Sequence, residues 1–320
     1  MTDDTILPRK KIAAIICTFQ RYDVLPAAIN SLLAQNANKD DFHIIVVDNS
    51  PRNPQQVAFQ QKYHLHENIF YHIEEIQGLS NARNVGAKMG NSLYTGYIDD
   101  DAVASPNWIT SMLEAFHTLS EPIGLVGGKV DPIWETERPD WLPTSAHGPL
   151  SIINWGKRAR ILKPDEWIVG ANFALVTSAL QAVGGFDTKL GRNGGSHTLV
   201  SNEEYELRLR IEAKGYLTFY SPTALVSHHV PTDRVSKSWF RRRMAWQAVS
   251  EYLQSDVMPD HNLEQAWDNI ESYFASLPAS KRTVRGLFEG FDDPGLNQEQ
   301  FGAIFSLMTL LLGGYEVTDV

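Results

Sequence analysis

Tyr97-Ile98-Asp99-Asp100-Asp101-Ala102 places three consecutive acidic residues at the end of a short apolar run that begins near Leu93. Residues 93–98 have the composition of a buried strand, and Pro106 shortly afterwards predicts the first turn of a helix. The acids therefore follow a strand in an α/β pattern. Open α/β sheets bind their ligands at the carboxyl ends of their strands, so this stretch indicates where a site would form.

The acidic stretch has two interpretations. Adjacent carboxylates repel one another and are costly to desolvate, so such a cluster either lies open to water as a solvated turn or holds a cation. Hard divalent ions such as Mg²⁺ or Mn²⁺ take carboxylate and phosphate oxygens as ligands. An EF-hand is excluded, because counting from Asp99 puts Ala104 where glycine is needed and Thr110 where the bidentate glutamate belongs.

The flanking segments alternate between strand and helix patterns. Residues 12–18 and 44–47 are continuous apolar runs, which predict strands buried on both faces and hence a parallel sheet. Apolar residues repeat at four-residue spacing from Val24 to Leu33, which predicts a helix between them. The remaining expected elements are helices at 55–63, after a cap at Ser80 or Asn81, at 178–183 and at 201–210, and strands at 69–73, 123–130, 173–177, 216–220 and 224–227. This series predicts an α/β fold with a mostly parallel central sheet flanked by helices, followed by a helical C-terminal extension from residue 236.

Composition limits the classes of protein to which the chain can belong. It has 320 residues, 43% of them hydrophobic, and a formal net charge of -10, which argues against chain-wide attraction to nucleic acid or anionic lipid. Cys17 is the single cysteine, which excludes an internal disulfide and a cysteine-rich zinc site, as expected in a reducing cytoplasm. No apolar stretch approaches the roughly 18 residues needed to cross a bilayer. We expect a cytoplasmic protein that is soluble or peripheral at the inner face of the membrane.

Six short motifs follow one another in a characteristic order and spacing. They are Thr-Phe-Gln-Arg at 18–21, Ile-Val-Val-Asp-Asn-Ser at 45–50, Gly-Leu-Ser-Asn-Ala-Arg-Asn at 78–84, the acids at 99–101, Glu203-Glu204, and His228. Together they resemble the family 2 glycosyltransferases of GT-A fold over about residues 10 to 235. Gly-Ala-Asn at 170–172 and Gly-Gly-Phe-Asp at 184–187 are similar to motifs of bacterial members.

The resemblance implies an α/β, Rossmann-like GT-A fold, with a nucleotide-sugar-binding and catalytic domain at 1–235 and a helical extension at 236–320. It also implies an inverting, Mn²⁺- or Mg²⁺-dependent glycosyltransferase of bacterial polysaccharide biosynthesis. The donor would be a UDP-, GDP- or dTDP-sugar. The acceptor would be a hydroxyl of a saccharide or a lipid-linked molecule.

The resemblance assigns roles to residues whose patterns alone have simpler interpretations, such as a solvated helix residue for Arg83 or a turn former for Asp48. Thr18 and Arg21 would lie beside the nucleotide, Asp48 would accept from the base, and Arg83 would contact base or diphosphate. The implied donor-binding residues are Thr18, Arg21, Asp48, Arg83, Asp99 and Asp100, and the implied metal ligands are Asp99, Asp101 and His228.

The general base is implied at Glu204, with Glu203 as the alternative, because this chain has Glu-Glu where the family usually has Glu-Asp. Local chemistry offers a structural interpretation as well. Ser201-x-x-Glu204 is a capping box, in which the glutamate would bind the first amide of the helix.

Two other functions fit parts of the pattern. A nucleotidyltransferase also uses paired acids on an α/β sheet, but it would need a glycine-rich basic loop after the first strand, where residues 18–22 lack glycine. A non-catalytic nucleotide- or sugar-binding module is the second alternative. Residues 191–195, with part of 131–166, are predicted to form a lid. The basic run 241–243 is either a solvated face or a contact with anionic lipid or with a diphosphate-lipid acceptor.

Overall fold

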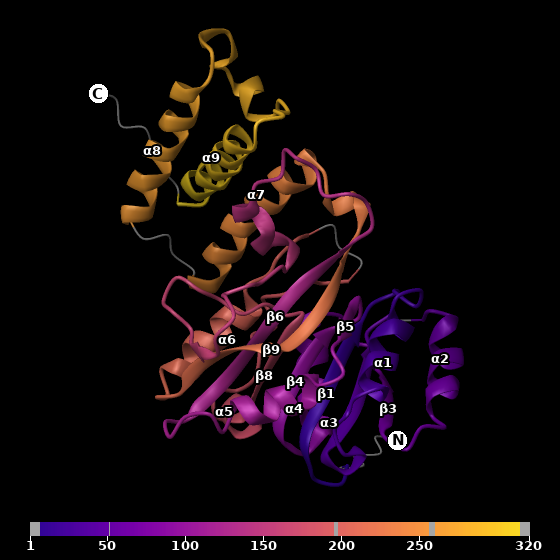
Figure 1. Ribbon diagram of the computed structural model, residues 1–320. Helices are drawn as coiled ribbons and strands as arrows, with labels where there is room; N and C mark the ends of the chain where they lie inside the picture. The colour runs from indigo at the N-terminus through magenta and orange to yellow at the C-terminus, as the bar shows by residue number, and fades with distance from the viewer. Residues whose placement is uncertain (1–6, 51, 195–197, 256–259, 314–320) are drawn as a thin grey trace. The chain divides into compact units, whose positions relative to one another are not determined.

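A computed structural model describes residues 7–50, 52–194, 198–255 and 260–313 of the chain. The chain divides into two compact units. The sheet unit comprises residues 1–133, 151–196 and 203–229, and the helical unit comprises 134–150, 197–202 and 230–320. Figure 1 shows the strands of the sheet unit gathered into one sheet with helices around it.

The parallel half of the sheet is formed by the elements predicted from the apolar runs. Its strands are β1 (Lys10–Thr18), β2 (Phe42–Asp48), β3 (Ile69–Ile73) and β4 (Ser92–Asp99). β1 pairs in parallel with both β2 and β4, and β2 with β3. Every residue of β2 is buried, as a continuous β-branched run predicts for a central strand.

Helices connect these strands and cover both faces. They are α1 (Leu25–Leu33), α2 (Gln55–Tyr63), α3 (Leu79–Gly90) and, later in the chain, α4 (Trp108–Ala115). α3 lies close on the sheet because it has glycine at two facing positions: a Cβ on Gly86 would lie 2.7 Å from Ile15 Cγ2, and one on Gly90 would lie 2.7 Å from Ala13 Cβ. α4 covers the opposite face, where the Trp108 ring rests on Gly96.

The second half of the sheet contains both antiparallel and parallel pairs. Among the described residues the strand order is β3-β2-β1-β4-β8-β6-β9-β5, with the two-residue β7 (Arg160–Ile161) paired to β9. β5 is Ala102–Ala104, β6 is Ile123–Trp134 and β8 is Asn172–Val176, followed by the short helix α5 (Thr177–Ala182). The sheet is therefore mixed: it is parallel from β3 to β4, β8 runs antiparallel to β4 and β6, and β5 and β7 run antiparallel to β9. β6 and β9 run in the same direction, because the Leu217 amide donates to the Pro122 carbonyl at one end and the Glu135 amide donates to the Val230 carbonyl at the other.

One prediction about this half of the sheet was wrong. The sequence predicted separate strands at 216–220 and 224–227, whereas β9 is continuous from Leu217 to Val230. Its first part pairs with β7 through Phe219 and Tyr220, and its later part pairs with β5. Pro222 lies where the partner changes, a position at which a strand can do without a backbone N–H.

The helix expected at Pro106 begins two residues later, at Trp108. The Trp108 amide donates to the Ser105 carbonyl at 3.0 Å, so residues 105–108 form a turn. The Pro106 carbonyl accepts from the Asn36 amide at 2.9 Å, which ties this turn to the end of α1.

Asn172 joins four elements at the centre of the sheet unit. Its Oδ1 accepts from Trp108 Nε1 at 2.7 Å, and its Nδ2 donates to the Lys129 and Ala224 carbonyls at 2.8 and 2.7 Å. Asn172 is completely buried, so water cannot reach its amide group. The three hydrogen bonds with protein atoms satisfy that group instead. The space for its amide exists because residue 128 is glycine: a Cβ there would overlap Asn172 Nδ2 and the Ala224 carbonyl.

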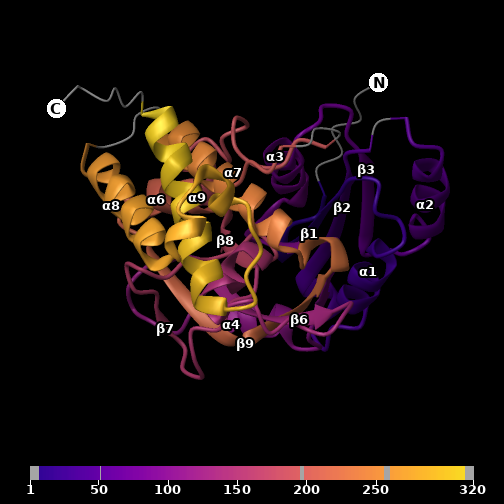
Figure 2. The same ribbon diagram turned by 90° about the horizontal axis from the view of Figure 1, so that it is seen from above.

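The helical unit contains α7 (Lys237–Ser255), α8 (Asp260–Ser276) and α9 (Pro294–Leu312). α8 and α9 run side by side (Figure 2). Their shared core contains Tyr273, Leu277, Leu287, Ala303 and Ile304. No helix in the described part of the chain is long and apolar enough to cross a membrane.

The basic run 241–243 does not form one exposed face. Arg243 is buried and its Nη2 donates to Ser201 Oγ at 3.0 Å, and Arg241 Nη1 lies 3.4 Å from the Glu289 carbonyl. Only Arg242 of the three is exposed. A continuous arginine surface for lipid is therefore not present in this helix.

Gly128→Ala should destabilise the protein by about 3 kcal/mol, because the added methyl group displaces either the Asn172 amide or the β9 backbone. Gly302→Ala in α9 is the matched control. A Cβ there meets nothing within 4 Å, so this substitution should be neutral or stabilise by up to ~1 kcal/mol. Urea denaturation measures both, and equal stability of Gly128→Ala and wild type would contradict close packing at the sheet centre.

Candidate active site

The acids form the turn between β4, which ends at Asp99, and β5, which begins at Ala102. The register of β4 with β1 pairs Cys17 with Asp99, so the turn lies beside the end of β1 at Thr18. The register of β5 with β9 pairs Ala102 with His228. The His229 amide donates to the Asp101 carbonyl at 2.9 Å and extends this pairing. Backbone pairing thus brings residues from three distant parts of the chain together.

Asp99, Asp101 and His228 each place one ligand atom within 4.8 Å of the others. His228 Nε2 lies 3.1 Å from Asp101 Oδ1, and both side chains are almost completely buried. Two carboxylate oxygens and one imidazole nitrogen are a donor set that suits Mn²⁺ and also admits Mg²⁺. The three metal ligands implied by the sequence resemblance therefore lie together, and their chemistry fits a divalent ion.

Arg21 and Thr18 bind the acids rather than pointing away from them. Thr18 Oγ1 donates to Asp100 Oδ2 at 2.7 Å. Arg21 Nη1 lies 3.2 Å from Asp100 Oδ1 and 2.7 Å from Asp101 Oδ2. Burial raises the pKa of Asp100 to about 7, against the attraction of Arg21. Both predicted nucleotide-binding residues therefore contact the acidic turn directly.

Arg83 is buried and pairs with Glu203 on α6 (Glu203–Glu212). Its Nη1 donates to Glu203 Oε1 at 2.7 Å, and its Nη2 lies 3.8 Å from Asp99 Oδ1. Burial is the largest single influence and raises the pKa of Glu203, but the positive charge of Arg83 and the hydrogen bonds to this carboxylate together outweigh burial and leave the pKa lowered. The glycine at 170 makes room for the guanidinium, since a Cβ there would overlap Arg83 Nη2.

Glu204 lies in a different environment from its neighbour. The Gly170 amide donates to Glu204 Oε1 at 3.1 Å. Burial, together with the negative charge of Glu203, raises the pKa of Glu204 to about 8. The two adjacent glutamates therefore have pKa values shifted in opposite directions.

The capping box expected from Ser201-x-x-Glu204 is not formed. α6 begins at Glu203, so Glu204 is its second residue rather than its third. The Ser201 amide donates to Ser250 Oγ at 3.0 Å, and the Glu204 carboxylate binds the Gly170 amide. Ser201 and Glu204 therefore bind residues distant in the chain, Ser250 and Gly170, instead of each other.

Asp48 is completely buried, and both of its carboxylate oxygens are hydrogen-bonded. Oδ2 accepts from Tyr22 Oη at 2.9 Å and from Tyr71 Oη at 2.6 Å, and Oδ1 accepts from the Ser50 amide at 3.0 Å. Its predicted contact with a base stays a prediction. The tyrosines were missed from the sequence, although Tyr71 lies in β3 at an alternating position, two residues before the one paired with Asp48.

The glycine-rich segment predicted as a lid is only partly described, because Gly195 lies outside the described residues. Its beginning contacts the start of α3: the Leu79 amide donates to the Arg192 carbonyl at 2.8 Å, and Ser80 Oγ donates to the Leu190 carbonyl at 2.6 Å. Movement of this segment as a lid stays a prediction.

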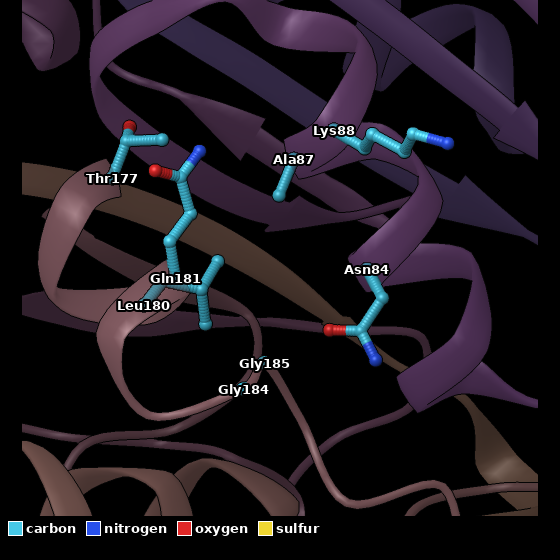
Figure 3. Close-up of a pocket in the computed structure, with 8 residues that line it drawn as sticks. All are labelled: Asn84, Ala87, Lys88, Thr177, Leu180, Gln181, Gly184 and Gly185. Carbon is cyan, nitrogen blue, oxygen red and sulfur yellow. The ribbon is translucent and has the colours of Figure 1, made fainter.

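A pocket of about 290 Å³ lies between α3 and α5, away from the predicted site residues. Figure 3 shows Asn84 and Lys88 on one helix and Leu180 and Gln181 on the other. Asn84 bonds both backbone groups of Phe186, at 2.8 and 3.0 Å. Phe186 in turn stacks on Arg83, with its ring centroid 5.5 Å from the guanidinium carbon. Asn84, in the wall of the pocket, therefore holds Phe186 in place, and the Phe186 ring packs against the Arg83 guanidinium.

Several known proteins are similar in sequence to this chain. The family model described as "Glycosyl transferase family 2" matches residues 13–180. The chain is 28% identical over 310 residues to the glucosyl-dolichyl phosphate glucuronosyltransferase of Haloferax volcanii, covering 95% of each protein. It is 26% identical over 261 residues to the succinoglycan biosynthesis protein ExoM of Rhizobium meliloti, covering 79% of this chain and 77% of ExoM.

Among solved structures, the mannosyltransferase PcManGT from Pyrobaculum calidifontis, in complex with GDP-Man and Mn²⁺, has a similar fold. The TM-score is 0.62 at 16% sequence identity, over 96% of this chain and 88% of that one. At this identity the likeness concerns the fold, and it extends over nearly the whole chain.

Glu204→Gln should reveal the cost of the buried charge through its pH dependence. The pKa of Glu204 is raised in the folded protein from 4.5 to about 8, so the stability contributed by its proton is fully present below pH about 4.5 and is lost as the pH rises towards 8. Glutamine does not titrate. The free energy of unfolding of the variant, relative to wild type, should therefore increase by about 3 kcal/mol between pH 6 and pH 9. Urea denaturation measures this difference, and a difference independent of pH would contradict a raised pKa at Glu204.

Proposed function

This chain belongs to glycosyl transferase family 2, and from that membership we propose that it transfers a sugar by an inverting mechanism with Glu204 as the general base. It is a glycosyltransferase of mixed α/β, GT-A fold, as its motifs predicted. Family membership favours transfer over the two alternatives raised by the sequence, a nucleotidyltransferase and a non-catalytic binding module.

The observation that carries the proposal is the difference between Glu203 and Glu204. An inverting transfer to a hydroxyl needs one carboxylate that takes a proton as the hydroxyl attacks. Glu203 is held by Arg83 and has a lowered pKa, which makes it a weak base. Glu204 has a pKa raised to about 8 and is oriented by the Gly170 amide. Its pKa therefore lies close to a neutral operating pH, where general bases are most effective.

The donor side of the proposed reaction uses the acidic turn and its cations. A divalent ion held by Asp99, Asp101 and His228 would supply positive charge to the leaving nucleoside diphosphate. Arg83, fixed between Glu203 and Asp99, adds a permanent cation on the same side. We propose Mn²⁺ or Mg²⁺ as the ion, with the former favoured by the nitrogen ligand.

The donor and the acceptor are proposed by class. The donor is a UDP-, GDP- or dTDP-sugar. A saccharide or lipid-linked acceptor is supported by the similarity to a protein named for glucosyl-dolichyl phosphate and to a succinoglycan biosynthesis protein. We further propose a cytoplasmic role in polysaccharide biosynthesis, with residues 1–235 as the donor-binding and catalytic domain and 236–320 as its helical extension.

Glu204→Gln should lower the turnover number by roughly 10²-fold or more while leaving binding of donor and Mn²⁺ unchanged, because glutamine keeps a hydrogen-bond acceptor for Gly170 but cannot take a proton. In the wild type, turnover should rise about tenfold from pH 7 to pH 9 as a group of pKa about 8 ionises. The donor for these steady-state assays is chosen first by adding UDP, GDP and dTDP separately to the protein. The nucleotide that raises the melting temperature most is then supplied as its nucleotide sugar. Glu206→Gln, two residues along the same helix, is the control and should turn over normally. Full activity of Glu204→Gln would rule out the assignment.

Asp101→Asn and His228→Asn should each weaken binding of UDP or GDP in the presence of Mn²⁺ by about tenfold or more, because each removes one proposed ligand. EDTA should have the same effect on the wild type. His229→Asn is the matched control, since neighbouring residues of a strand point to opposite faces. Calorimetric affinity that is equal with and without Mn²⁺ would count against a metal at this site.

A further inference from the structure

Arg21 is the cation that pairs with Asp100 and Asp101 of the acidic turn, whereas Arg83 approaches Asp99. Its Nη1 lies between two carboxylates, 2.7 Å from Asp101 Oδ2 and 3.2 Å from Asp100 Oδ1. The Arg21 side chain is 32% exposed, whereas those of Asp100 and Asp101 are 8% and 2% exposed. The Arg21 carbonyl accepts from the Leu25 amide at 3.1 Å, which fixes the base of the side chain at the start of α1.

The two oxygens of Asp101 face different groups. Oδ2 binds Arg21, and Oδ1 lies 3.1 Å from His228 Nε2, within the Asp99–Asp101–His228 cluster. A cation bound by that cluster would therefore share one carboxylate with Arg21. Two positive charges on one carboxylate repel each other, most strongly where water is excluded.

Without a metal, three carboxylates occupy consecutive positions in this turn and two of them are buried. Buried carboxylates without a counter-charge cost several kcal/mol each. Arg21 supplies that charge to Asp100 and Asp101, while Arg83 lies nearest to Asp99 at 3.8 Å. The Arg21 guanidinium therefore serves as the counter-charge of the two buried carboxylates in the folded protein.

We propose that Arg21 is the counter-ion of the metal-free acidic turn and that it opposes binding of a divalent ion until a diphosphate is also present. This inference rests on the proposed metal and donor site. A diphosphate accepts strong hydrogen bonds from a guanidinium and adds negative charge. It gives Arg21 a second partner and removes the repulsion. Metal and nucleotide consequently bind with positive coupling, and the coupling free energy passes through Arg21.

A simpler role for Arg21, contact with the nucleotide alone, makes a different prediction. In that case neutralising Arg21 weakens nucleotide binding and has no effect on binding of Mn²⁺ by itself. The counter-ion role predicts that neutralising Arg21 tightens binding of Mn²⁺ alone, because the competing charge is gone. Mn²⁺ in the absence of nucleotide therefore separates the two roles.

The experiment titrates MnCl₂ into wild type, Arg21→Gln and Arg21→Lys by calorimetry, with and without UDP or GDP, and records melting temperatures in EDTA. Arg21→Gln should melt several degrees lower than wild type in EDTA, and should bind Mn²⁺ alone about tenfold or more tightly. The factor by which UDP or GDP increases the affinity for Mn²⁺ should be smaller in this variant than in wild type, by a similar amount. Arg21→Lys keeps the charge but presents a single ammonium, so it should be intermediate.

Arg210→Gln is the matched control. Arg210 pairs with Glu206 elsewhere in the sheet unit and has a side-chain exposure of 31%, close to that of Arg21. Its substitution should alter the melting temperature without altering the affinity for Mn²⁺.

The inference is overturned if Arg21→Gln binds Mn²⁺ alone no more tightly than wild type. If Arg21→Gln does not fold, Arg21→Lys decides: tighter binding of Mn²⁺ than in wild type sustains the inference, and equal or weaker binding overturns it. Failure of the proposed metal site gives another result, in which wild type binds UDP or GDP but binds no Mn²⁺ with or without them.

Discussion

A guanidinium and a carboxylate, 2.7 Å apart and both almost removed from water, join α3 to α6 in the sheet unit. Arg83 and Glu203 are 120 residues apart in the chain. Removing either partner of such a pair leaves an uncompensated buried charge, at a cost of about 3–5 kcal/mol. The rings of Tyr97, Phe173 and Phe186 surround the same guanidinium at 5.5–5.9 Å. One ion pair therefore holds the helix that carries Glu204 near Asp99, whose backbone is placed by the pairing of β4 with β1.

That pair also explains how two identical neighbouring side chains acquire different chemistry. Glu203 takes the cation, whereas Glu204 receives the negative charge of Glu203 and accepts a hydrogen bond from a backbone amide. Burial raises the pKa of both carboxyls. At Glu204 the charge of Glu203 adds to this effect, whereas at Glu203 the charge of Arg83 and the hydrogen bonds to the carboxylate reverse it. Pairs of titratable groups whose environments separate their pKa values are a recurring arrangement in enzymes that need an acid and a base.

The features predicted correctly from the sequence are those with a local pattern. Continuous apolar runs predict β1 and β2, four-residue spacing predicts α1, and the motif order predicts the family. Features set by tertiary partners were missed or mistaken. The capping box at Ser201 gives way to Ser250 and Gly170, β9 continues through Pro222 because its partner changes there, and the tyrosines on Asp48 meet only after β1, β2 and β3 pair. The Gly170 amide carries no side-chain signal, so residue patterns alone could not connect it with Glu204.

Gly170 serves two charged residues by different means: its N–H holds Glu204, and its missing side chain admits Arg83. The positions of the Glu204 carboxylate and the Arg83 guanidinium therefore both depend on residue 170. A substitution that adds a Cβ at position 170 would therefore disturb both charged residues at once, although neither of them is itself substituted.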